Sequence, residues 1–351
     1  METPICLKPW NELHIWAYGA TFCCWADVYA TYAPFQPSQY LWNSKALNDI
    51  RNKMLNEGIK AVCPNCPLYV GTLDREIENH KNQFPSDKWD TVGRNNVLSN
   101  SSEYPLVSFI TVGNKCNSAC KMCWLRTNPT AQREMIMEHR IIDRLKHIVG
   151  KGEHIEFSGG DLFALTDNQI NSFLNVSDTA TFTAITNGQG LSFDRMEKYI
   201  FSGKIPRLKI SMETPRENDY FKHCGRKQGD LLQRLELLNG RNVVWYSTVV
   251  TTWTLEGLPD FVSFAAKTNV FNVNIKPYVG TTLEDTGFGF ANIFLEGWTP
   301  VMHDRALLIF SECERISKRT GVLICGLDLC KQALDKGKER YEQFKQQTER
   351  V

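Results

Sequence analysis

Three cysteines in one short stretch constrain the fold of this chain more than any other feature of its sequence. Cys116, Cys120 and Cys123 have the spacing C-x3-C-x2-C. They follow an apolar run, Leu106 to Val112, whose β-branched and aromatic residues predict a buried strand. Thiolates this near to one another can all bind one soft metal centre, either zinc or an iron–sulfur cluster. The stretch therefore predicts a metal-binding loop at the end of a strand.

The number of ligands distinguishes zinc from an iron–sulfur cluster. A structural zinc ion normally takes four protein ligands, and no fourth Cys or His lies within this loop. Three thiolates on a cube of four irons would instead leave one iron open for another ligand. The sequence therefore favours a cluster with one open iron over a zinc loop.

Composition limits the classes of partner and compartment. The chain of 351 residues has a formal net charge of +1, whereas nucleic-acid binders usually carry a basic excess, so nucleic acid is an unlikely partner. We find no charged-then-apolar leader and no uninterrupted apolar run of about 18 residues, so we expect no signal peptide and no membrane span. Twelve cysteines without a secretory signal favour metal binding in a reducing compartment. We expect a cytoplasmic protein.

Strand and helix patterns alternate beyond residue 104. Apolar runs predict strands at Pro105–Val112, His154–Phe157, Ala180–Thr186, Arg207–Ser211, Val243–Val250 and Val270–Lys276. Helical patterns separate these strands, and the capping-box pair Thr166 and Gln169 begins one of the helices. This alternation implies right-handed βαβ units and a parallel sheet. Because active sites of parallel α/β barrels lie at the carboxyl ends of the strands, residues that follow the strands are functional candidates.

A pair of cysteines near the N-terminus flanks a predicted hairpin. Cys6, Gly19 and Cys24 have the spacing C-x12-G-x4-C, and the alternation over residues 13–25 predicts two strands that turn near Gly19. The hairpin would bring Cys6 and Cys24 toward each other. Cys23 competes with its neighbour Cys24, which we prefer on spacing alone.

A second pair of cysteines follows a predicted helix. Ser44 is the expected N-cap of a helix over about Lys45–Asn56, which Gly58 ends. Cys63 and Cys66 follow with C-x2-C spacing. The two pairs together supply four thiolates, a closed set that suits either an auxiliary cluster or the zinc ion of a zinc ribbon.

The cysteine loop and the motifs after the next strands resemble the radical SAM superfamily. These motifs are Ser158-Gly159-Gly160-Asp161, Thr186-Asn187-Gly188 and Ser211-Met212-Glu213. The resemblance implies an α/β fold, a partial (β/α)6 TIM-like barrel, with a [4Fe–4S] cluster on Cys116, Cys120 and Cys123. It further implies that the open iron binds S-adenosylmethionine (SAM) and that an electron donor such as flavodoxin or ferredoxin drives its cleavage. The resulting 5′-deoxyadenosyl radical would abstract a hydrogen atom from the substrate.

The resemblance also implies the residues that bind SAM. The predicted residues are Met122, Ser158, Gly159, Gly160, Asp161, Asn187, Ser211, Glu213 and Arg226. Asp161 stands where the family usually has Glu, and keeps the carboxylate. Met122 stands where the family usually has an aromatic residue, and a soft apolar side chain can cover the cluster or the adenine. Asn187 could instead belong to an ordinary Asn-Gly turn, and Arg226 could be a solvated surface arginine.

The N-terminal cysteines resemble the auxiliary-cluster modules called SPASM and, in shortened form, twitch. The family's cysteines beyond the C-x2-C pair are absent here, and the module precedes the barrel. The resemblance therefore implies one auxiliary [4Fe–4S] cluster, bound by Cys6, Cys24, Cys63 and Cys66 in a small α+β module. The predicted boundaries are residues 1–80 for this module, 81–103 for a polar linker, 104–300 for the barrel and 301–351 for a C-terminal helical segment.

Enzymes with such modules mostly modify peptides or proteins, and we expect the same function here, with the auxiliary cluster assisting electron transfer. The alternative within the class is a dehydrogenase of a small molecule, a sugar or an aminocyclitol. The alternative outside it is a non-catalytic zinc-ribbon protein that holds a partner. Cys224, which follows His223, is a candidate hydrogen-atom donor to a substrate radical. Cys313, Cys325 and Cys330 have no assigned role, and Cys313 is expected to be a small buried apolar residue.

Overall fold

The computed structural model describes residues 5–16, 19–23, 30–31, 42–64, 71–123, 143, 146–147, 149–278, 293–294 and 298–348. The chain forms two compact units. The first contains residues 1–115 and 135–184, and the second contains residues 116–134 and 185–351. The first helical pattern after the cysteine loop places Met137, Ile141, Leu145 and Ile148 on one face, and these four residues lie outside the described ones.

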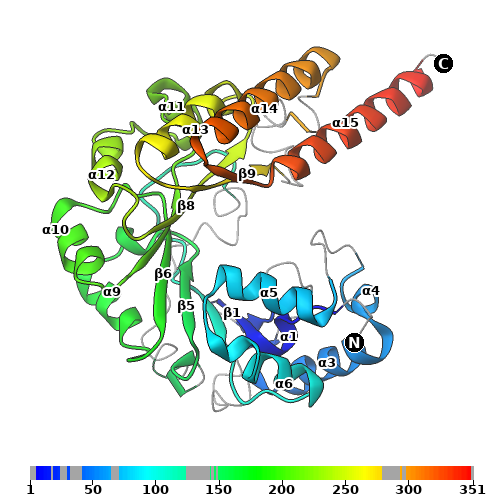
Figure 1. Cartoon of the computed structure of the whole chain (residues 1–351), viewed down its shortest axis with the longest axis vertical. Helices are drawn as coiled ribbons and strands as arrows, with labels where there is room; N and C mark the ends of the chain where they lie inside the picture. Colours follow the sequence, from blue (N-terminus) through cyan, green and yellow to red (C-terminus); the bar gives the residue numbers. More distant parts are fainter. Residues whose placement is uncertain are drawn as a thin grey trace. The chain divides into compact units, whose positions relative to one another are not determined.

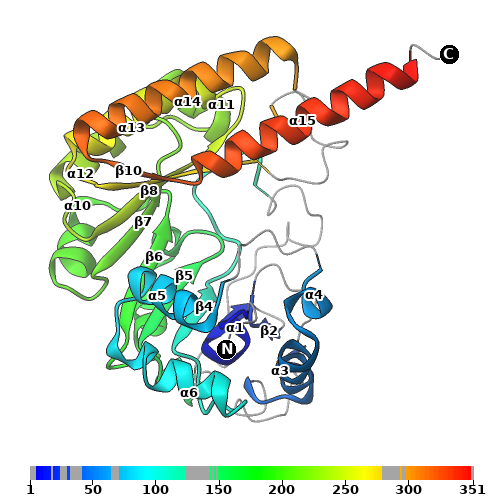
Figure 2. The same cartoon turned by 45° about the vertical axis from the view of Figure 1, so that its right-hand side comes forward.

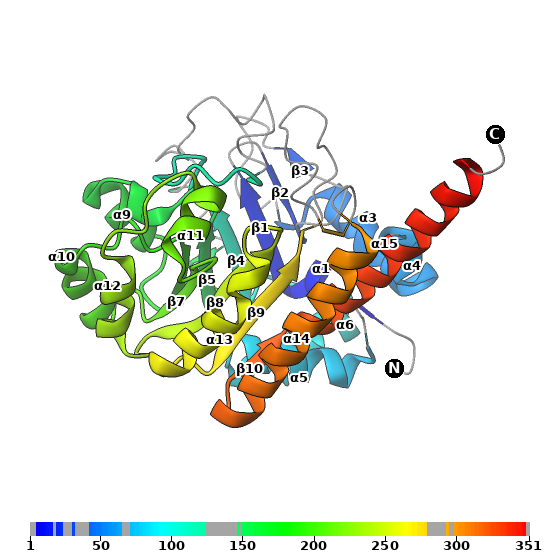
Figure 3. The ribbon, with the colours of Figure 1, turned by 90° about the horizontal axis from the view of Figure 1, so that it is seen from above.

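The first unit is built on strands β1 (Glu12–Trp16), β2 (Gly19–Thr21), β3 (Ala30–Thr31), β4 (Val107–Thr111) and β5 (His154–Ser158), with the start of β6 (Thr181–Thr186). β4, β5 and β6 pair in parallel, as predicted. The predicted hairpin is confirmed, since β1 and β2 are antiparallel with Trp16 opposite Gly19. β1 also pairs in parallel with β4, which the sequence did not predict (Figure 3).

The helices of the first unit are α1 (Lys8–Asn11), α3 (Lys45–Glu57), α4 (Ile59–Val62), α5 (Leu73–Gln83), α6 (Val92–Leu98) and α9 (Asp167–Leu174), with the 3-10 turns η1 (Asp87–Trp89) and η3 (Leu162–Ala164) (Figure 1). Two predicted helix starts are confirmed. The Ser44 hydroxyl accepts a hydrogen bond from Leu47 N at the start of α3, and Thr166 forms the capping box of α9 with Gln169.

The segment 81–103, predicted to be a linker, is folded into the core of the first unit. It contains the end of α5, the turn η1 and the helix α6. Phe84, Trp89 and Val97 from this segment are buried in one cluster with Leu7 and Trp10. Composition does not reveal this packing, because only these few apolar residues, far apart in a polar stretch, anchor the segment.

The second unit contains the end of β6 and strands β7 (Arg207–Ser211), β8 (Val243–Val250), β9 (Asn272–Pro277) and β10 (Leu323–Cys325). β7 to β10 pair in parallel in this order (Figure 2). The sequence did not predict the strand β10. This strand has only three residues, and because it lies at the edge of the sheet it does not need a run of apolar residues. The predicted α/β fold with parallel strands is confirmed.

The helices of the second unit cover these strands. They are α10 (Phe193–Arg195), which continues as the π-helix Met196–Phe201, α11 (Glu217–Cys224), α12 (Leu231–Leu238), α13 (Leu258–Lys267), α14 (Pro300–Thr320) and α15 (Leu327–Thr348), with the 3-10 turn Leu255–Gly257. α13 and α14 lie side by side (Figure 2). Within the described residues, none of the helices is both long and apolar enough to cross a membrane.

Candidate active site

The three cysteines of the C-x3-C-x2-C loop belong to the second unit. Cys116 is exposed, Cys120 and Cys123 are partly buried, and none of the described cysteines forms a disulfide. The Cys116 sulfur accepts hydrogen bonds from Ser118 N and from Asn187 Nδ2, both at 3.4 Å. Donors that point at a sulfur stabilise its thiolate form, which is the form that binds metal. The loop therefore presents thiols in a setting that suits metal binding.

The C-terminal end of α11 holds this loop in place. Ala119 N donates to Cys224 O at 2.9 Å and Lys121 N donates to His223 O at 3.0 Å, so the amides on both sides of Cys120 are fixed. The last carbonyls of a helix have no partner within the helix, and here the cysteine loop supplies one. Gly225 ends the helix at φ 67°, and a Cβ there would lie 2.9 Å from Ala119. Only glycine allows this close approach without strain.

Asn187 and Arg226, two of the predicted SAM-binding residues, both contact the cysteine loop at Asn117. Asn187 Nδ2 donates to Asn117 Oδ1 at 2.9 Å, and Arg226 Nη1 donates to the Asn117 carbonyl. The Nε atom of Arg226 is buried and has no hydrogen-bond partner within the described part of the chain. A guanidinium with an unused N–H suits a carboxylate ligand, so the arrangement fits the SAM carboxylate that the resemblance implies. These contacts also show that Arg226 is not merely a solvated surface residue.

Ser211 and Glu213 lie at the carboxyl end of β7. The Ser211 hydroxyl is 3.3 Å from the Ser247 hydroxyl of β8. Glu213 is buried, and its carboxyl group accepts a hydrogen bond from Val249 N at 2.9 Å. Burial raises the pKa of Glu213 to about 7. Met122, like Trp253 and Tyr278, is partly buried and packs against a hydrophobic cluster.

The predicted Ser158-Gly159-Gly160-Asp161 motif belongs to the first unit. It follows β5 and runs close beside residues 113–115, where Gly160 N donates to Gly113 O at 2.7 Å and Asp161 N donates to Lys115 O at 2.8 Å. The buried Asp161 carboxylate accepts a hydrogen bond from Phe163 N at 2.9 Å and so begins a 3-10 turn. The motif is thus a tightly packed main-chain turn at the end of a strand.

Alanine at Gly160 is expected to destabilise the protein. The added Cβ would lie 2.1 Å from Lys115 O, and this main-chain atom cannot rotate away. Overpacking of this kind costs about 1–3 kcal/mol. The matched control is Gly71→Ala, whose added Cβ would have atoms of the flexible Arg75 side chain as its three nearest neighbours and should cost less than about 1 kcal/mol. Urea unfolding measures the free energy of unfolding of both variants. Equal stability of Gly160→Ala and wild type would contradict the packing argument.

Two of the four predicted auxiliary ligands lie among the described residues. Cys6 is buried and Cys63 is partly buried, whereas Cys24 and Cys66 lie outside the described residues. Cys23 is buried and lies close to both Cys6 and Lys8. Burial raises the pKa of the Cys6 thiol. The choice between Cys23 and Cys24 stays a prediction.

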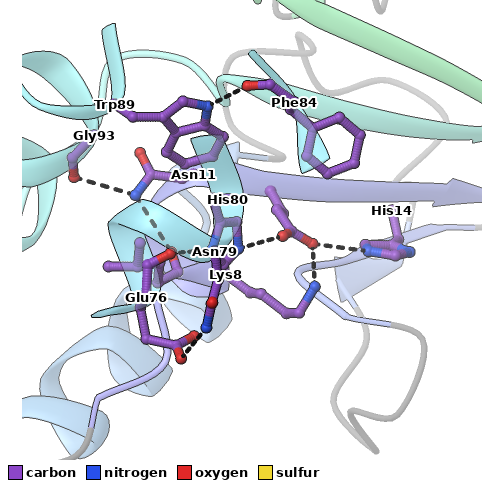
Figure 4. A network of polar contacts seen from close by, with 11 residues as sticks. Lys8, Asn11, His14, Glu76, Asn79, His80, Phe84, Trp89 and Gly93 are labelled. Carbon is purple, nitrogen blue, oxygen red and sulfur yellow. Dashed lines mark hydrogen bonds and ion pairs between the residues drawn. The ribbon is translucent and has the colours of Figure 1, made fainter. Parts of the chain in front are cut away.

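A buried network of charged and polar side chains lies in the first unit (Figure 4). Two of its members, Lys8 and Glu12, are close enough to Cys6 to affect the pKa of its thiol. At the centre of the network is Glu12, whose carboxylate accepts hydrogen bonds from Lys8 Nζ at 2.5 Å and contacts His80 Nε2 at 2.9 Å. His14 Nε2 lies 3.5 Å from the same carboxylate. Sequence reasoning missed this network because α1, β1 and α5 bring together residues that share no motif.

Cys224, the candidate hydrogen-atom donor, is buried at the end of α11. A hydrogen bond with Cys120 and burial both raise the pKa of the Cys224 thiol. Its role stays a prediction.

No three His, Cys, Asp or Glu side chains of the described part of the chain converge on a single metal ion. The ligands of an iron–sulfur cube bind separate irons, so their sulfur atoms need not meet as closely as the ligands of one ion.

Comparison with known families and structures shows what this chain is similar to. The profile of the Radical SAM superfamily matches residues 110–265, a segment that holds the cysteine loop and all three glycine and serine motifs. No curated protein matches the sequence.

Two of the solved structures that are similar to this chain are as follows. Native anSMEcpe with bound AdoMet and Kp18Cys peptide has a TM-score of 0.50 at 16% identity, over 63% of this chain and 63% of anSMEcpe. SuiB of Streptococcus suis bound to its precursor peptide SuiA has a TM-score of 0.45 at 16% identity, over 78% of this chain and 60% of SuiB. The chain thus spans less than two thirds of the length of either structure, and the similarity concerns the fold alone.

Proposed function

We propose that this chain, an enzyme of the radical SAM superfamily, uses a [4Fe–4S] cluster and SAM to modify a peptide or protein by abstracting a hydrogen atom. The observation that carries the proposal is the cysteine loop, whose main-chain amides α11 fixes and whose first sulfur accepts two N–H donors. A bound cluster would supply one electron to SAM and so start radical chemistry. The electron would come from a donor such as flavodoxin or ferredoxin.

In this proposal the described residues have two tasks. Cys116, Cys120 and Cys123 hold the cluster. The residues that bind and orient SAM are Met122, Ser158, Gly159, Gly160, Asp161, Asn187, Ser211, Glu213 and Arg226. The unused Nε of Arg226 and the hydrogen-bonding groups at the ends of β7 and β8 support this assignment. Charged and polar groups at fixed positions orient a cofactor without having to rearrange when it binds.

The choice of a peptide or protein substrate rests on the N-terminal cysteines and on one solved structure. The spacing of Cys6, Gly19, Cys63 and Cys66 resembles auxiliary-cluster modules, which occur mostly in peptide-modifying enzymes. The anSMEcpe structure contains a peptide together with AdoMet, and we extend both kinds of ligand to this chain. We propose that Cys6, Cys24, Cys63 and Cys66 bind an auxiliary [4Fe–4S] cluster that takes up an electron after hydrogen abstraction.

Cys63→Ala is expected to separate SAM cleavage from modification of the substrate. The anaerobically reconstituted variant should still form 5′-deoxyadenosine from SAM with a reductant, because the loop around Cys120 is intact. It should fail to modify the peptides encoded beside the gene, since the auxiliary electron acceptor would be lost. Mass spectrometry measures both products in the same sample.

The control for this experiment is Cys325→Ala, an exposed cysteine in β10 that should leave both products unchanged. Normal peptide modification by Cys63→Ala would show that the auxiliary role is wrong. A wild-type protein that holds only zinc and forms no 5′-deoxyadenosine would show that the enzymatic function is wrong.

A further inference from the structure

A buried glutamate and a buried histidine face each other in the second unit. Glu213 follows β7 and has a side chain that is 6% exposed, and His223 in the last turn of α11 is 0% exposed. Glu213 Oε2 and His223 Nε2 are 3.5 Å apart. His223 Nε2 is buried and has no hydrogen-bond partner among the residues that the structure describes. A movement of a few tenths of an ångström would bring the two atoms within ordinary hydrogen-bond distance, about 3.0 Å.

The main chain at Glu213 is held in an unfavourable conformation. Its φ of 63° lies in the left-handed region, which a glutamate rarely adopts. Two contacts with β8 hold it there, because Glu213 N donates to Ser247 O at 3.2 Å and the carboxyl group accepts from Val249 N at 2.9 Å. Strained residues that are held in this way cluster at active sites and ligand-binding sites. The strain therefore indicates that the direction of the Glu213 carboxyl group is important for binding or catalysis.

The other ring nitrogen of His223 belongs to a chain of hydroxyl groups. His223 Nδ1 lies 3.4 Å from the Thr251 hydroxyl, which in turn lies 3.3 Å from the Thr254 hydroxyl. Thr254 donates its own proton to Val249 O at 2.6 Å, so it can only accept from Thr251. The single proton of Thr251 can therefore go either to Thr254 or to His223 Nδ1.

These two positions of one proton set the tautomer of His223. If Thr251 donates to Nδ1, the ring proton is on Nε2 and faces an ionised Glu213. If Thr251 donates to Thr254, the ring proton is on Nδ1, and Nε2 can accept from a protonated Glu213. His223 is neutral in both states, in agreement with burial, which lowers the pKa of His223 to about 4. The other titratable groups that act on the pair are Lys121, Tyr220, Cys224 and Lys276.

We propose that His223 is a positioning residue for SAM, because it holds the Glu213 carboxyl group in place. By changing tautomer, His223 also allows that carboxyl group to gain or lose a proton while the imidazole ring itself stays neutral. An ionised Glu213 accepts hydrogen bonds from the hydroxyl groups of the ligand, whereas a protonated one donates. This inference rests on the proposed function, because it requires SAM to bind beside Glu213. Sequence reasoning had named Glu213 but not His223.

The test is the dissociation constant of SAM, measured by equilibrium dialysis on anaerobically reconstituted protein without a reductant, so that no turnover occurs. Wild type should bind SAM more tightly as the pH rises through about 7, where Glu213 ionises.

Three variants test the role of His223. His223→Leu should bind SAM about tenfold more weakly above this pH, and the inflection of its plot of affinity against pH should move to higher pH, because the carboxylate loses a donor. His223→Gln keeps an N–H donor and should bind within about threefold of wild type. His303→Leu, a histidine of α14, is the matched control and should bind as wild type does.

A second readout needs no His223 variant. The infrared band of the protonated Glu213 carboxyl group should disappear in wild type as the pH passes about 7, and Glu213→Gln, which lacks the band, identifies it. A carboxyl band that does not titrate, or His223→Leu with the affinity and pH profile of wild type, would overturn the inference. Failure of wild type to bind SAM at any pH would overturn the proposed function and this inference with it.

Discussion

Cys120→Ala is expected to abolish cleavage of SAM. The proposed cluster has only three protein ligands, and alanine removes one of them, so the cluster should be lost or should be too unstable to transfer an electron. Formation of 5′-deoxyadenosine should fall by at least about a thousandfold, and the iron content by about four atoms per chain. Chromatographic quantification of the nucleoside and iron analysis of reconstituted protein measure the two effects.

Cys120 is the most informative of the three cysteines because the amides on both sides of it are hydrogen-bonded to α11. These bonds belong to the main chain and do not depend on the side chain, so the loop should keep its shape in the variant. The matched control is Cys313→Ala, which removes a buried thiol from α14 and should leave cleavage unchanged. Retention of iron and of cleavage by Cys120→Ala would show that another side chain or a different metal site supports the chemistry.

The strands were predictable because they read as separate apolar runs. All six predicted strands are present, with ends that differ from the prediction by at most two residues. In β5 a buried apolar residue stands at every second position, as Ile155 and Phe157 show. Such runs are visible without knowledge of the partner strands. The cysteine loop was visible for a similar reason, since its ligands are close in sequence.

The pairing of β1 with β4 was not predictable from local patterns. The hairpin of β1 and β2 could be recognised, but nothing near Leu13 shows that the free side of β1 pairs with a strand about 95 residues later. The helix α11 was not predictable from local patterns either. It is short and polar, and among its residues only Tyr220, His223 and Cys224 are buried. It has too few apolar positions to produce a helical period, although its end holds the cysteine loop.

The contacts of His223 show where sequence reasoning about the site ends. Its partners Glu213 and Thr251 follow two different strands, and no spacing within the sequence relates them to α11. The predicted domain boundaries were placed where the composition of the sequence changes, and composition does not show which distant segments pack together. The compact units instead group residues 1–115 with 135–184 and residues 116–134 with 185–351, and the predicted boundaries stay a prediction.

Glu12→Ala is expected to destabilise the folded protein more than Gly160→Ala does. The Glu12 side chain is 1% exposed and pairs with Lys8 and His80, at 2.5 Å and 2.9 Å. Burial by itself would raise the pKa of Glu12, but Lys8 and the two histidines outweigh it and lower that pKa well below 4.5. The carboxylate is therefore ionised in the folded protein, and alanine would leave the mostly buried Lys8 without its partner. Removing one member of a buried ion pair costs about 3–5 kcal/mol.

The pH dependence of this effect follows from the direction of the shift. Because folding lowers the pKa of Glu12, its contribution to stability is present above the unfolded value of 4.5 and is lost as the pH falls through the lower folded value. The difference in unfolding free energy between wild type and Glu12→Ala should thus be largest near neutral pH and should shrink in strong acid. Urea unfolding at several pH values measures it.

A surface ion pair of the same spacing provides the control. Lys45 and Asp49 are four residues apart, as Lys8 and Glu12 are, with a distance of 2.6 Å, but their side chains are 89% and 58% exposed. Asp49→Ala should therefore cost less than about 0.5 kcal/mol. An equal loss in the two alanine variants would contradict the argument from burial.

The double variant Lys8→Met with Glu12→Leu separates the cost of an unpaired charge from the value of the pair. Apolar residues of similar volume often replace a buried ion pair at little cost, so most of the stability lost in Glu12→Ala should return. Cys6 lies beside this network, and the charge of Lys8 acts on its thiol. If the double variant is stable but binds less iron than wild type, the network serves the predicted auxiliary site. If it is stable and binds the same iron, the network serves the fold alone.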